Sequence, residues 1–151
     1  MLPLRRSYRR AGRSLGVAAV EFALVSTVLV MLLFGGIEFG RLLWTWNAAA
    51  EATRLGARLA VVCGQDATTQ AFIKSRMQTM LPALGPSNIS LSYAPDSCTV
   101  TDCLSATVSL SNYRFVLNIP FVPASVNPML PPFTTTLSRE YMTSAGNNIC
   151  S

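Results

Sequence analysis

The sequence has no histidine and few charged residues. Only 13% of its 151 residues are Asp, Glu, Lys or Arg, whereas 50% are hydrophobic. Without histidine, the Ser/His/Asp and Cys/His arrangements of nucleophilic enzymes are excluded. No P-loop or dinucleotide-binding glycine pattern occurs in the sequence. We therefore expect a protein that is not an enzyme and that takes no cofactor and no small-molecule substrate.

Acidic residues are absent before Gly16, and no charge of either sign occurs from Phe22 to Ile37. A chain with a net charge of +5 is a candidate for binding nucleic acid. Here, however, the excess of basic residues flanks an apolar run. In that position it indicates the orientation of the chain in the membrane, with the arginines on the cytoplasmic side. We therefore expect no nucleic-acid partner. The arginines in question are Arg5, Arg6, Arg9, Arg10 and Arg13.

The apolar run is long enough to cross a membrane. Its 23 residues from Leu15 to Ile37 are interrupted by one charge, and about 20 apolar residues suffice for a spanning helix. The residues after the run are then exported. A secretory signal peptide cut near Ala50 is the alternative. It is disfavoured because the run exceeds the usual length of such a core and because Glu38 and Arg41 precede the cut.

Glu21 is the charge within this run and the first candidate functional residue. A carboxylate deep in a bilayer costs about 2.5–3.5 kcal/mol on insertion scales, so it usually has a partner and a function. Glu21 follows Val17 by one helical turn. Cleavage after Gly16 would give Val17 a charged amine that a neighbouring identical chain could offer to Glu21. Alternatively, the chain is a permanent anchor whose Glu21 reaches toward the leader arginines.

The helical pattern continues beyond the apolar run. Proline is absent from Glu38 to Cys63, and Trp44 and Trp46 lie where an interfacial aromatic belt is expected. One helix over about 17–62 would be roughly 70 Å long. The expected organisation is a basic leader (1–16), a long helix that spans the membrane in its first half (17–63) and an exported domain (64–151).

Small residues occur at a spacing of four along the expected helix, first as a pair at 36 and 40 and then from 48 to 60, and such stripes let two helices approach closely. We expect this stripe to pack against another element, which the sequence does not assign to this chain or to a partner. Alternatively, alanine is present only because it favours helix. The stripe consists of Gly36, Gly40, Ala48, Ala52, Gly56 and Ala60.

The exported segment changes from a helical to a strand-like period. A second helix is expected to begin at a cap, Asp66 or Thr68, and to end by Pro82. Alternating apolar residues then predict strands near 89–93, 104–119 with a β-bulge at Ser111–Asn112, and 133–143. The expected fold is α+β, with a second helix in the exported domain and a core made by a short antiparallel sheet packed on the second half of the long helix.

Four cysteines, Cys63, Cys98, Cys103 and Cys150, all follow the apolar run, on the side where disulfides persist. Four cysteines allow three pairings. We favour Cys98–Cys103, which closes the loop between the first two strands, and Cys63–Cys150, which ties the chain's last residues to the end of the long helix. A metal clip at Cys98 and Cys103 is the alternative, but structural zinc prefers closer pairs with further ligands. We expect no metal.

Three segments of the first half carry a family resemblance. The segments are RSLGVAAVEFAL (13–24), FGGIEFGRLL (34–43) and ATRLGARLA (52–60). Together they resemble the TadE-like family, pseudopilins of the tight-adherence (Flp) pilus within the type IV filament superfamily. The resemblance covers about residues 12–62 and does not extend into the exported segment.

The resemblance implies roles for particular residues. Gly16 matches the last leader residue recognised by a prepilin peptidase, and Val17 becomes the new N-terminus. Glu21 matches the acidic residue that such peptidases and filaments use, and Phe22 matches its usual aromatic neighbour. One departure is the absence of the proline that members often carry near the position of Ser26–Thr27.

The resemblance also implies the setting of the protein. It implies a pilin-like fold and a minor pseudopilin in the bacterial inner membrane, with a cytoplasmic N-terminus and a periplasmic or extracellular domain. Its implied partners are the prepilin peptidase, other pilins and pseudopilins of the same system, and the inner membrane. Whether such a protein enters the pilus fibre is left open.

Overall fold

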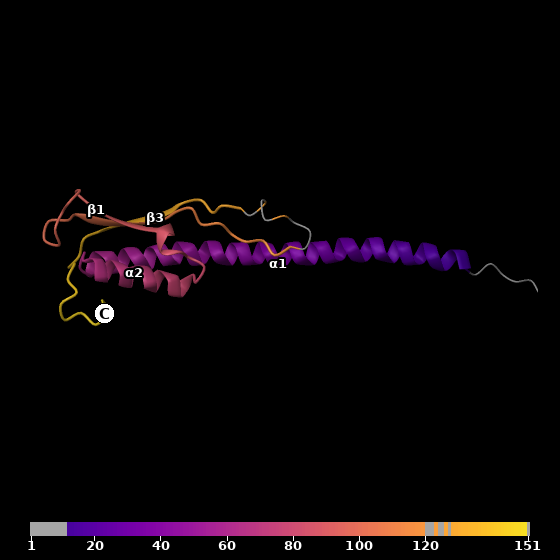
Figure 1. The fold of residues 1–151 in the computed structure, drawn as a ribbon, viewed down its shortest axis with the longest axis horizontal. Helices are drawn as coiled ribbons and strands as arrows, with labels where there is room; N and C mark the ends of the chain where they lie inside the picture. Colours follow the sequence, from indigo (N-terminus) through magenta and orange to yellow (C-terminus); the bar gives the residue numbers. More distant parts are fainter. Residues whose placement is uncertain (1–11, 120–122, 124–125, 127, 151) are drawn as a thin grey trace, which may run out of the picture. The chain divides into compact units, whose positions relative to one another are not determined.

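The computed structural model describes residues 12–119, 123, 126 and 128–150. The chain forms two compact units that divide between Phe39 and Gly40, so helix α1 contributes to both. The elements confirm the expected α+β fold, with a long helix, a second helix and a short antiparallel sheet (Figure 1). They are α1 (Gly12–Val62), α2 (Ala67–Met80), a 3₁₀ turn (Pro86–Asn88), β1 (Ile89–Ala94), β2 (Ser105–Leu110) and β3 (Phe133–Ser138).

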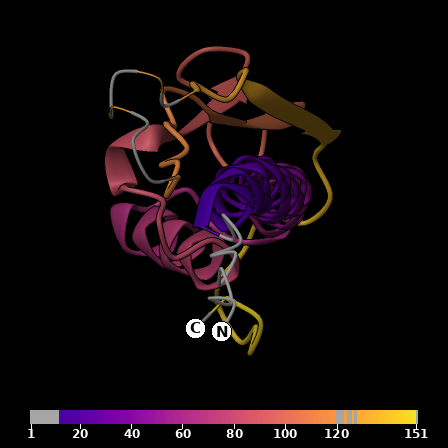
Figure 2. The same ribbon diagram turned by 90° about the vertical axis from the view of Figure 1, so that its right-hand side faces the viewer.

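The unit that begins at Gly40 has two layers. Its helical layer consists of α2 and the second half of α1, and Figure 2 shows both on the same face of the sheet. The part of α1 in this unit buries a face of small residues, all fully inaccessible to solvent: Ala49, Ala52, Ala57 and Ala60. Because these side chains are short, α2 and the sheet pack close to the α1 backbone.

Gly56 lies at the closest approach within this core. A Cβ atom added to Gly56 would lie 2.6 Å from Met77 Sδ on α2 and 3.2 Å from Val108 Cγ1 on β2. Both Met77 and Val108 are fully buried and have little room to move aside. The absence of a side chain at Gly56 therefore allows one helix to contact both the second helix and the sheet.

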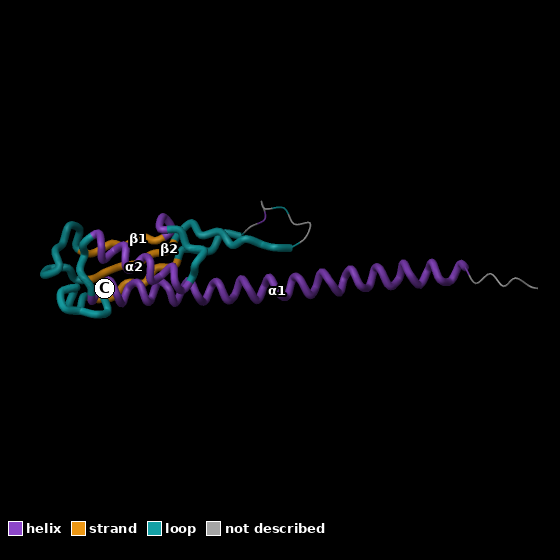
Figure 3. The backbone as a smooth tube through the Cα atoms, turned by 60° about the horizontal axis from the view of Figure 1, so that its bottom comes forward, coloured by secondary structure: helices purple, strands orange, loops and turns teal. Residues whose placement is uncertain are grey.

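The sheet is antiparallel, with the strand order β1-β2-β3 (Figure 3). Leu110 of β2 pairs with Ile89 of β1 on one side and with Phe133 of β3 on the other. Along β2, Ala106, Val108 and Leu110 are fully buried, and the residues between them are partly exposed. This alternation is the period-two pattern that predicted the strand.

The predicted continuation of the second strand to residue 119 is wrong. Asn112 adopts a positive φ of 57°, which redirects the chain after β2. Beyond it, among the described residues, the backbone pairs in an isolated bridge between Arg114 and Met129. Tyr113 and Phe115 are nevertheless buried, so apolar alternation persists without a regular strand. Burial of alternate side chains, rather than a bulge, explains the pattern.

The last strand is shorter than the predicted range 133–143, because the chain after β3 caps helix α1. The backbone N–H of Met142 donates to Val61 O at 3.3 Å, and that of Thr143 donates to Val62 O at 2.9 Å. The last carbonyls of a helix have no partner within the helix. Residues that could have extended the sheet therefore satisfy the end of α1 instead.

Asp66 is the N-cap of α2. It is one of the two caps predicted from the sequence, the other being Thr68. Its carboxylate accepts hydrogen bonds from the Thr69 backbone N–H at 2.9 Å and from the Thr69 hydroxyl at 2.7 Å. These bonds hold the pKa of Asp66 below its ordinary value. The Thr69 hydroxyl also lies 3.0 Å from that of Ser144, which accepts from Gly64 N at 3.0 Å. The cap thus joins the α1–α2 connection to the C-terminal segment.

Both disulfides have the pairing favoured from the sequence. Cys63–Cys150 links residues 87 positions apart, and Cys98–Cys103 closes a short loop between β1 and β2. Gln65 Nε2 donates to Cys103 Sγ at 2.7 Å, which connects the short loop to the end of the helical layer. Cys63–Cys150 therefore ties the end of α1 to the C-terminal segment, and the Gln65 hydrogen bond joins the α1–α2 connection to the loop between β1 and β2.

The substitution Gly56→Leu should destabilise the folded unit by about 1–3 kcal/mol, because a larger side chain forces Met77 and Val108 apart. Gly40→Leu is the matched control on the same helix, since a Cβ at Gly40 would meet nothing within 4 Å. Thermal unfolding in detergent, followed by near-UV circular dichroism, measures both variants. Equal stability of the two would contradict the close approach at Gly56.

Thiol labelling of the denatured, unreduced protein should give no signal, because all four cysteines are paired. Replacing Cys63 and Cys150 by serine should cost about 2 kcal/mol more than replacing Cys98 and Cys103, because the entropy of loop closure grows with loop length. Denaturant unfolding of the two double variants measures the difference. A larger loss of stability on replacing Cys98 and Cys103 would show that loop length does not determine the free-energy cost.

Candidate functional site

The predicted cleavage position lies near the start of α1. The peptide bond between Gly16 and Val17 is inside the helix, which begins at Gly12. Both residues are exposed, and a Cβ at Gly16 would meet nothing within 4 Å. The described part of the chain therefore leaves this bond uncovered. The leader arginines up to Arg10 lie outside the described residues.

Glu21 lies on the exposed surface of α1, one turn after Val17. Its neighbours Val20 and Phe22 are 61% and 74% exposed, so the carboxylate stands on an otherwise apolar surface. Among the described residues, no hydrogen bond or ion pair to the Glu21 side chain is formed. A group that compensates this carboxylate in hydrocarbon has to come from elsewhere.

The surrounding segment of α1 is apolar on every side. Its most apolar 18-residue window has a mean hydropathy of 2.5 and no residue buried by the rest of the chain. By length and composition, α1 is the one helix among the described residues that could cross a membrane. Exposed side chains in this segment include Leu24, Val28, Met31, Leu32 and Leu33. In water this surface would be a large apolar patch, so it requires lipid or protein around it.

The two hydroxyl residues of the segment are satisfied within the helix. The hydroxyls of Ser26 and Thr27 donate to the carbonyl oxygen of Ala23 at 3.1 Å and 2.7 Å. Internal hydrogen bonds of this kind allow serine and threonine to sit in hydrocarbon without unsatisfied polar groups. These residues occupy the position where the resembled family often has proline, and α1 continues through them as regular helix.

The small-residue stripe divides into two parts with different surroundings. Ala52, Gly56 and Ala60 are buried in the core of the folded unit, and Ala48 is half-buried. Gly36 and Gly40 are exposed, and a Cβ at either would meet nothing within 4 Å. The later part of the stripe is thus occupied by this chain's own core. The two glycines remain as a surface that another helix could approach.

Three carboxylates after the apolar segment have local structural partners. Asp66 caps α2, and Asp102 accepts from Thr99 N at 2.6 Å, which holds the pKa of Asp102 below its ordinary value. Glu51 pairs with Arg54 at 2.7 Å on the surface of α1. No group of three His, Cys, Asp or Glu residues suited to a metal occurs within the described part of the chain. These carboxylates stabilise turns and helix ends.

One feature was not predicted from the sequence, a cavity at the end of the folded unit where α1 enters it. Arg41 and Trp44 of α1 line it together with residues 81–83 and 113–116. The spacing of Arg41 and Trp44 along a helix after an apolar run could have indicated a polar-aromatic site. Nothing in the sequence indicated that residues 113–116 would meet them, because that contact joins segments that are far apart in the sequence.

Part of the first half of the chain is similar to a known protein family. Residues 16–58 match the family model described as TadE-like protein. This confirms the resemblance over the segment that contains Gly16, Glu21 and the apolar span, and it suggests involvement in the tight-adherence pilus. The family matched is a structural, non-enzymatic one. No curated protein matches the chain. No solved structure matches it either.

Proposed function

We propose that this protein is a minor pseudopilin that takes part in assembling an adhesive tight-adherence pilus. In this proposal a prepilin peptidase cuts the chain between Gly16 and Val17, and α1 anchors the mature protein in the inner membrane. The observation that carries the proposal is the family match from residue 16 onward, over a helix whose exposed apolar surface bears one carboxylate.

Charge and cysteine placement support the proposed topology. The basic residues before Gly16 favour a cytoplasmic N-terminus, because positive charge resists translocation. Both disulfides follow the apolar segment, and disulfides persist in the oxidising space outside the cytoplasm. Residues 64–151 would therefore be periplasmic or extracellular.

Glu21 is proposed to pair with the α-amine of Val17 on an adjacent subunit. The amine is created by cleavage, so the pair can form only in processed chains. A buried carboxylate with no partner is strongly unfavourable, whereas a pair of opposite charges in hydrocarbon is much less so. This requirement would select the axial position of one helix relative to the next. The neighbouring subunits would be other pilins and pseudopilins of the same system.

Gly36 and Gly40 are proposed as the place where neighbouring helices approach. Both lie on exposed α1 surface, and their missing side chains allow backbone-to-backbone contact. Association inside a membrane depends on such packing, because lipid and leucine are equally apolar. The protein would thus act through helix contacts, without a catalytic group.

A permanent, uncleaved anchor carrying an exported scaffold or binding module is the second candidate. One observation favours it: the Gly16–Val17 bond lies within regular helix, which starts at Gly12 and continues without interruption. Glu21 would then lie near the cytoplasmic surface, with its carboxylate directed toward the leader arginines. N-terminal sequencing separates the two candidates.

In a cell that contains prepilin peptidase, the mature protein should begin at Val17. The substitution Gly16→Leu should abolish this cleavage, because a branched side chain crowds the residue before the cut. Gly12→Leu, a control glycine four residues upstream, should be cleaved normally. N-terminal sequencing of the membrane-extracted proteins gives the answer. A wild-type N-terminus at Met1 would favour the permanent anchor.

Glu21→Ala should leave the exported unit folded while reducing co-purification with other pilus subunits by about tenfold or more, as expected for loss of one buried ion pair. Glu51→Ala is the matched control, because Glu51 is an exposed glutamate of the same helix with its own partner, Arg54. Quantitative pull-down from crosslinked membranes measures both. Normal co-purification of the Glu21 variant would refute the proposed pairing.

A further inference from the structure

The face of the sheet that points away from the helices consists almost entirely of hydroxyl side chains. Each strand turns three residues toward this face, and all of them are serine or threonine except Ala94. Two pairs already meet across the strands, Ser90 with Ser109 at 2.6 Å and Thr107 with Thr136 at 2.8 Å. This hydroxyl face carries no charged residue, so no like charges oppose its extension by a further strand.

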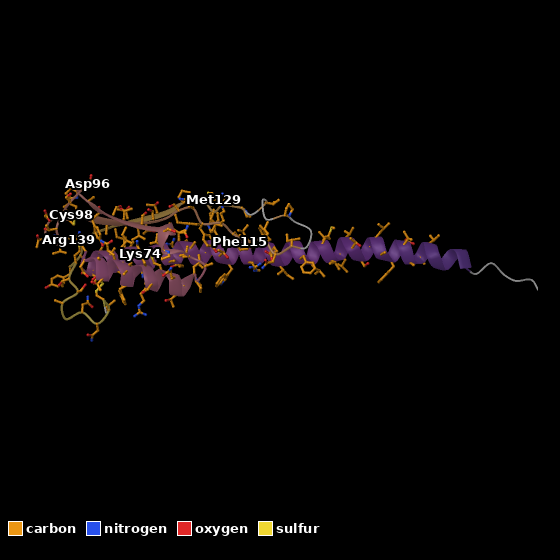
Figure 4. The ribbon with its side chains drawn as sticks, viewed as in Figure 1. Lys74, Asp96, Cys98, Phe115, Met129 and Arg139 are labelled. Atoms are coloured by element: carbon orange, nitrogen blue, oxygen red, sulfur yellow. A yellow bond between two sulfur atoms is a disulfide. The ribbon has the colours of Figure 1, made fainter. Side chains whose placement is uncertain are left out.

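The two outer strands of the sheet, β1 and β3, are unprotected edges. Natural edge strands are usually shielded by charged residues, by proline, by bulges or by a covering segment. The two strands read ISLSYA and FTTTLS, with neither charge nor proline. The charged residues Asp96 and Arg139 come only after the strands, and Figure 4 shows both at the same end of the folded unit. In Figure 2, β3 (gold) lies at the border of the sheet away from α2.

The free backbone groups of β3 follow from its ladder with β2. In an antiparallel ladder, residues that bond to one neighbouring strand alternate with residues that face the other way. The backbone N–H of Arg139 donates to Leu104 O at 2.9 Å, so the odd-numbered residues of β3 bond to β2. Among the described residues, no hydrogen bond is formed to the backbone groups that face the free edge. These groups belong to Thr134, Thr136 and Ser138.

The edge of β1 offers the complementary set of backbone groups. The backbone N–H of Ser111 donates to Asn88 O at 2.9 Å, so the even-numbered residues of β1 bond to β2. The odd-numbered residues Leu91 and Tyr93, which are half-buried, therefore face the free edge. The edge groups of β3 thus belong to residues of the hydroxyl face, whereas those of β1 belong to residues of the opposite face. Two parallel strands can bond in this combination, because each residue bonds to the two residues that flank its opposite number.

Strand β1 of a second copy fits along β3 in a register that continues both faces of the sheet. The pair would be parallel, because β1 and β3 are both antiparallel to β2. With Thr136 opposite Ser92 of the second copy, hydroxyl side chains continue one face and half-buried side chains continue the other. The same register brings Arg139 near Asp96 of the second copy, which has the opposite charge. Glu140 leaves the sheet here, since its backbone N–H donates to the end of α1.

We propose that β3 of one copy pairs in parallel with β1 of a second copy, so that the sheets of neighbouring subunits join edge to edge. The inference rests on the membrane anchoring proposed above, because two chains anchored in one membrane enter their folded units from the same end. Parallel pairing repeats this orientation, whereas pairing of β3 with β3 would reverse one unit. Each copy keeps one free edge, so the contact is heterologous and can be repeated along a row of subunits.

Cysteine pairs in the full chain, in native membranes, test the contact. Two differently tagged copies are co-expressed, one with Thr136→Cys and the other with Ser92→Cys, and mild oxidation is followed by non-reducing electrophoresis. The four native cysteines are paired and contribute no free thiol. We expect a disulfide-linked heterodimer, because neighbouring strands lie about 4.8 Å apart and a disulfide tolerates Cα separations up to about 7 Å.

Ser90→Cys is the matched control for this pair, because Ser90 is an equally exposed serine of the same strand and the same face. It lies two residues before Ser92, which places its Cα about 8 Å from that of Thr136 in the proposed register. This separation is too long for a disulfide. The heterodimer should therefore form several-fold less with Ser90→Cys than with Ser92→Cys.

Substitution at the edge tests the backbone pairing, with Thr134→Cys and Ser90→Cys as the reporting pair. Thr136→Pro removes an N–H that faces the free edge and leaves the ladder with β2 intact. It should lower the heterodimer about fivefold or more, the factor expected for loss of one hydrogen bond. Thr136→Lys, which adds a charge without changing the backbone, should act likewise if the proline disturbs folding. Thr136→Val keeps the N–H and should link normally.

Three results would overturn the proposal: no heterodimer from Thr136→Cys and Ser92→Cys, equal linking of Ser90→Cys, or unchanged linking after both Thr136→Pro and Thr136→Lys. A Thr136→Cys homodimer as abundant as the heterodimer would show that β3 pairs with β3 and would also refute it. Failure of the proposed anchoring is read separately. A chain that an alkaline wash removes from the membrane would refute the anchoring, while the disulfides would still report on the sheet edge.

Discussion

The close approach at Gly56 is the contact on which the folded unit depends. One helix there has to contact α2 and the sheet, and a single Cβ would already lie 2.6 Å from Met77 Sδ. The same requirement explains why Ala52 and Ala60, one turn away on either side, are fully buried. Small side chains bring α2 and β2 onto the α1 backbone, and the apolar area buried between them stabilises the unit. The Cys63–Cys150 disulfide and the hydrogen bonds to Val61 O and Val62 O then hold the chain at the end of this helix.

Before Gly40, α1 meets a different physical requirement. No part of its most apolar window is buried by the chain itself, so the environment has to supply the apolar contacts. Uniform apolarity allows insertion but gives a helix no preferred neighbour, because every side is equivalent in lipid. Specificity then has to come from the exceptions in the segment. The exceptions include Glu21, for which we propose a partner of opposite charge, and Gly36, where a second backbone could approach.

The sequence predicted the features that depend on local patterning. The long helix, the cap at Asp66 and the period of β2 follow from apolar spacing and side-chain chemistry within a few residues. Prediction from the sequence failed where the structure depends on contacts between segments that are far apart in the chain. Leu104 continues the alternation of β2, yet it is 72% exposed outside the strand. The last strand stops early because the backbone N–H groups of Glu140, Met142 and Thr143 donate to the end of α1 instead. The cavity lay beyond prediction for the same reason, since its lining requires Phe115 to reach Arg41.

The carboxylates with local partners differ in their surroundings from Glu21, for which we propose a partner on another chain. Asp66, Asp102 and Glu51 each have a partner within a few residues, and each stabilises a turn or a helix surface. Glu21 differs because its neighbours along the helix are apolar, and a carboxylate at the centre of a bilayer costs about 2.5–3.5 kcal/mol on insertion scales. A residue that destabilises the isolated chain in a membrane is tolerated when it is stabilised in an assembly. In the proposed assembly, the free energy recovered on pairing would favour the assembled state over the single helix, and Glu21 would link membrane insertion to subunit association.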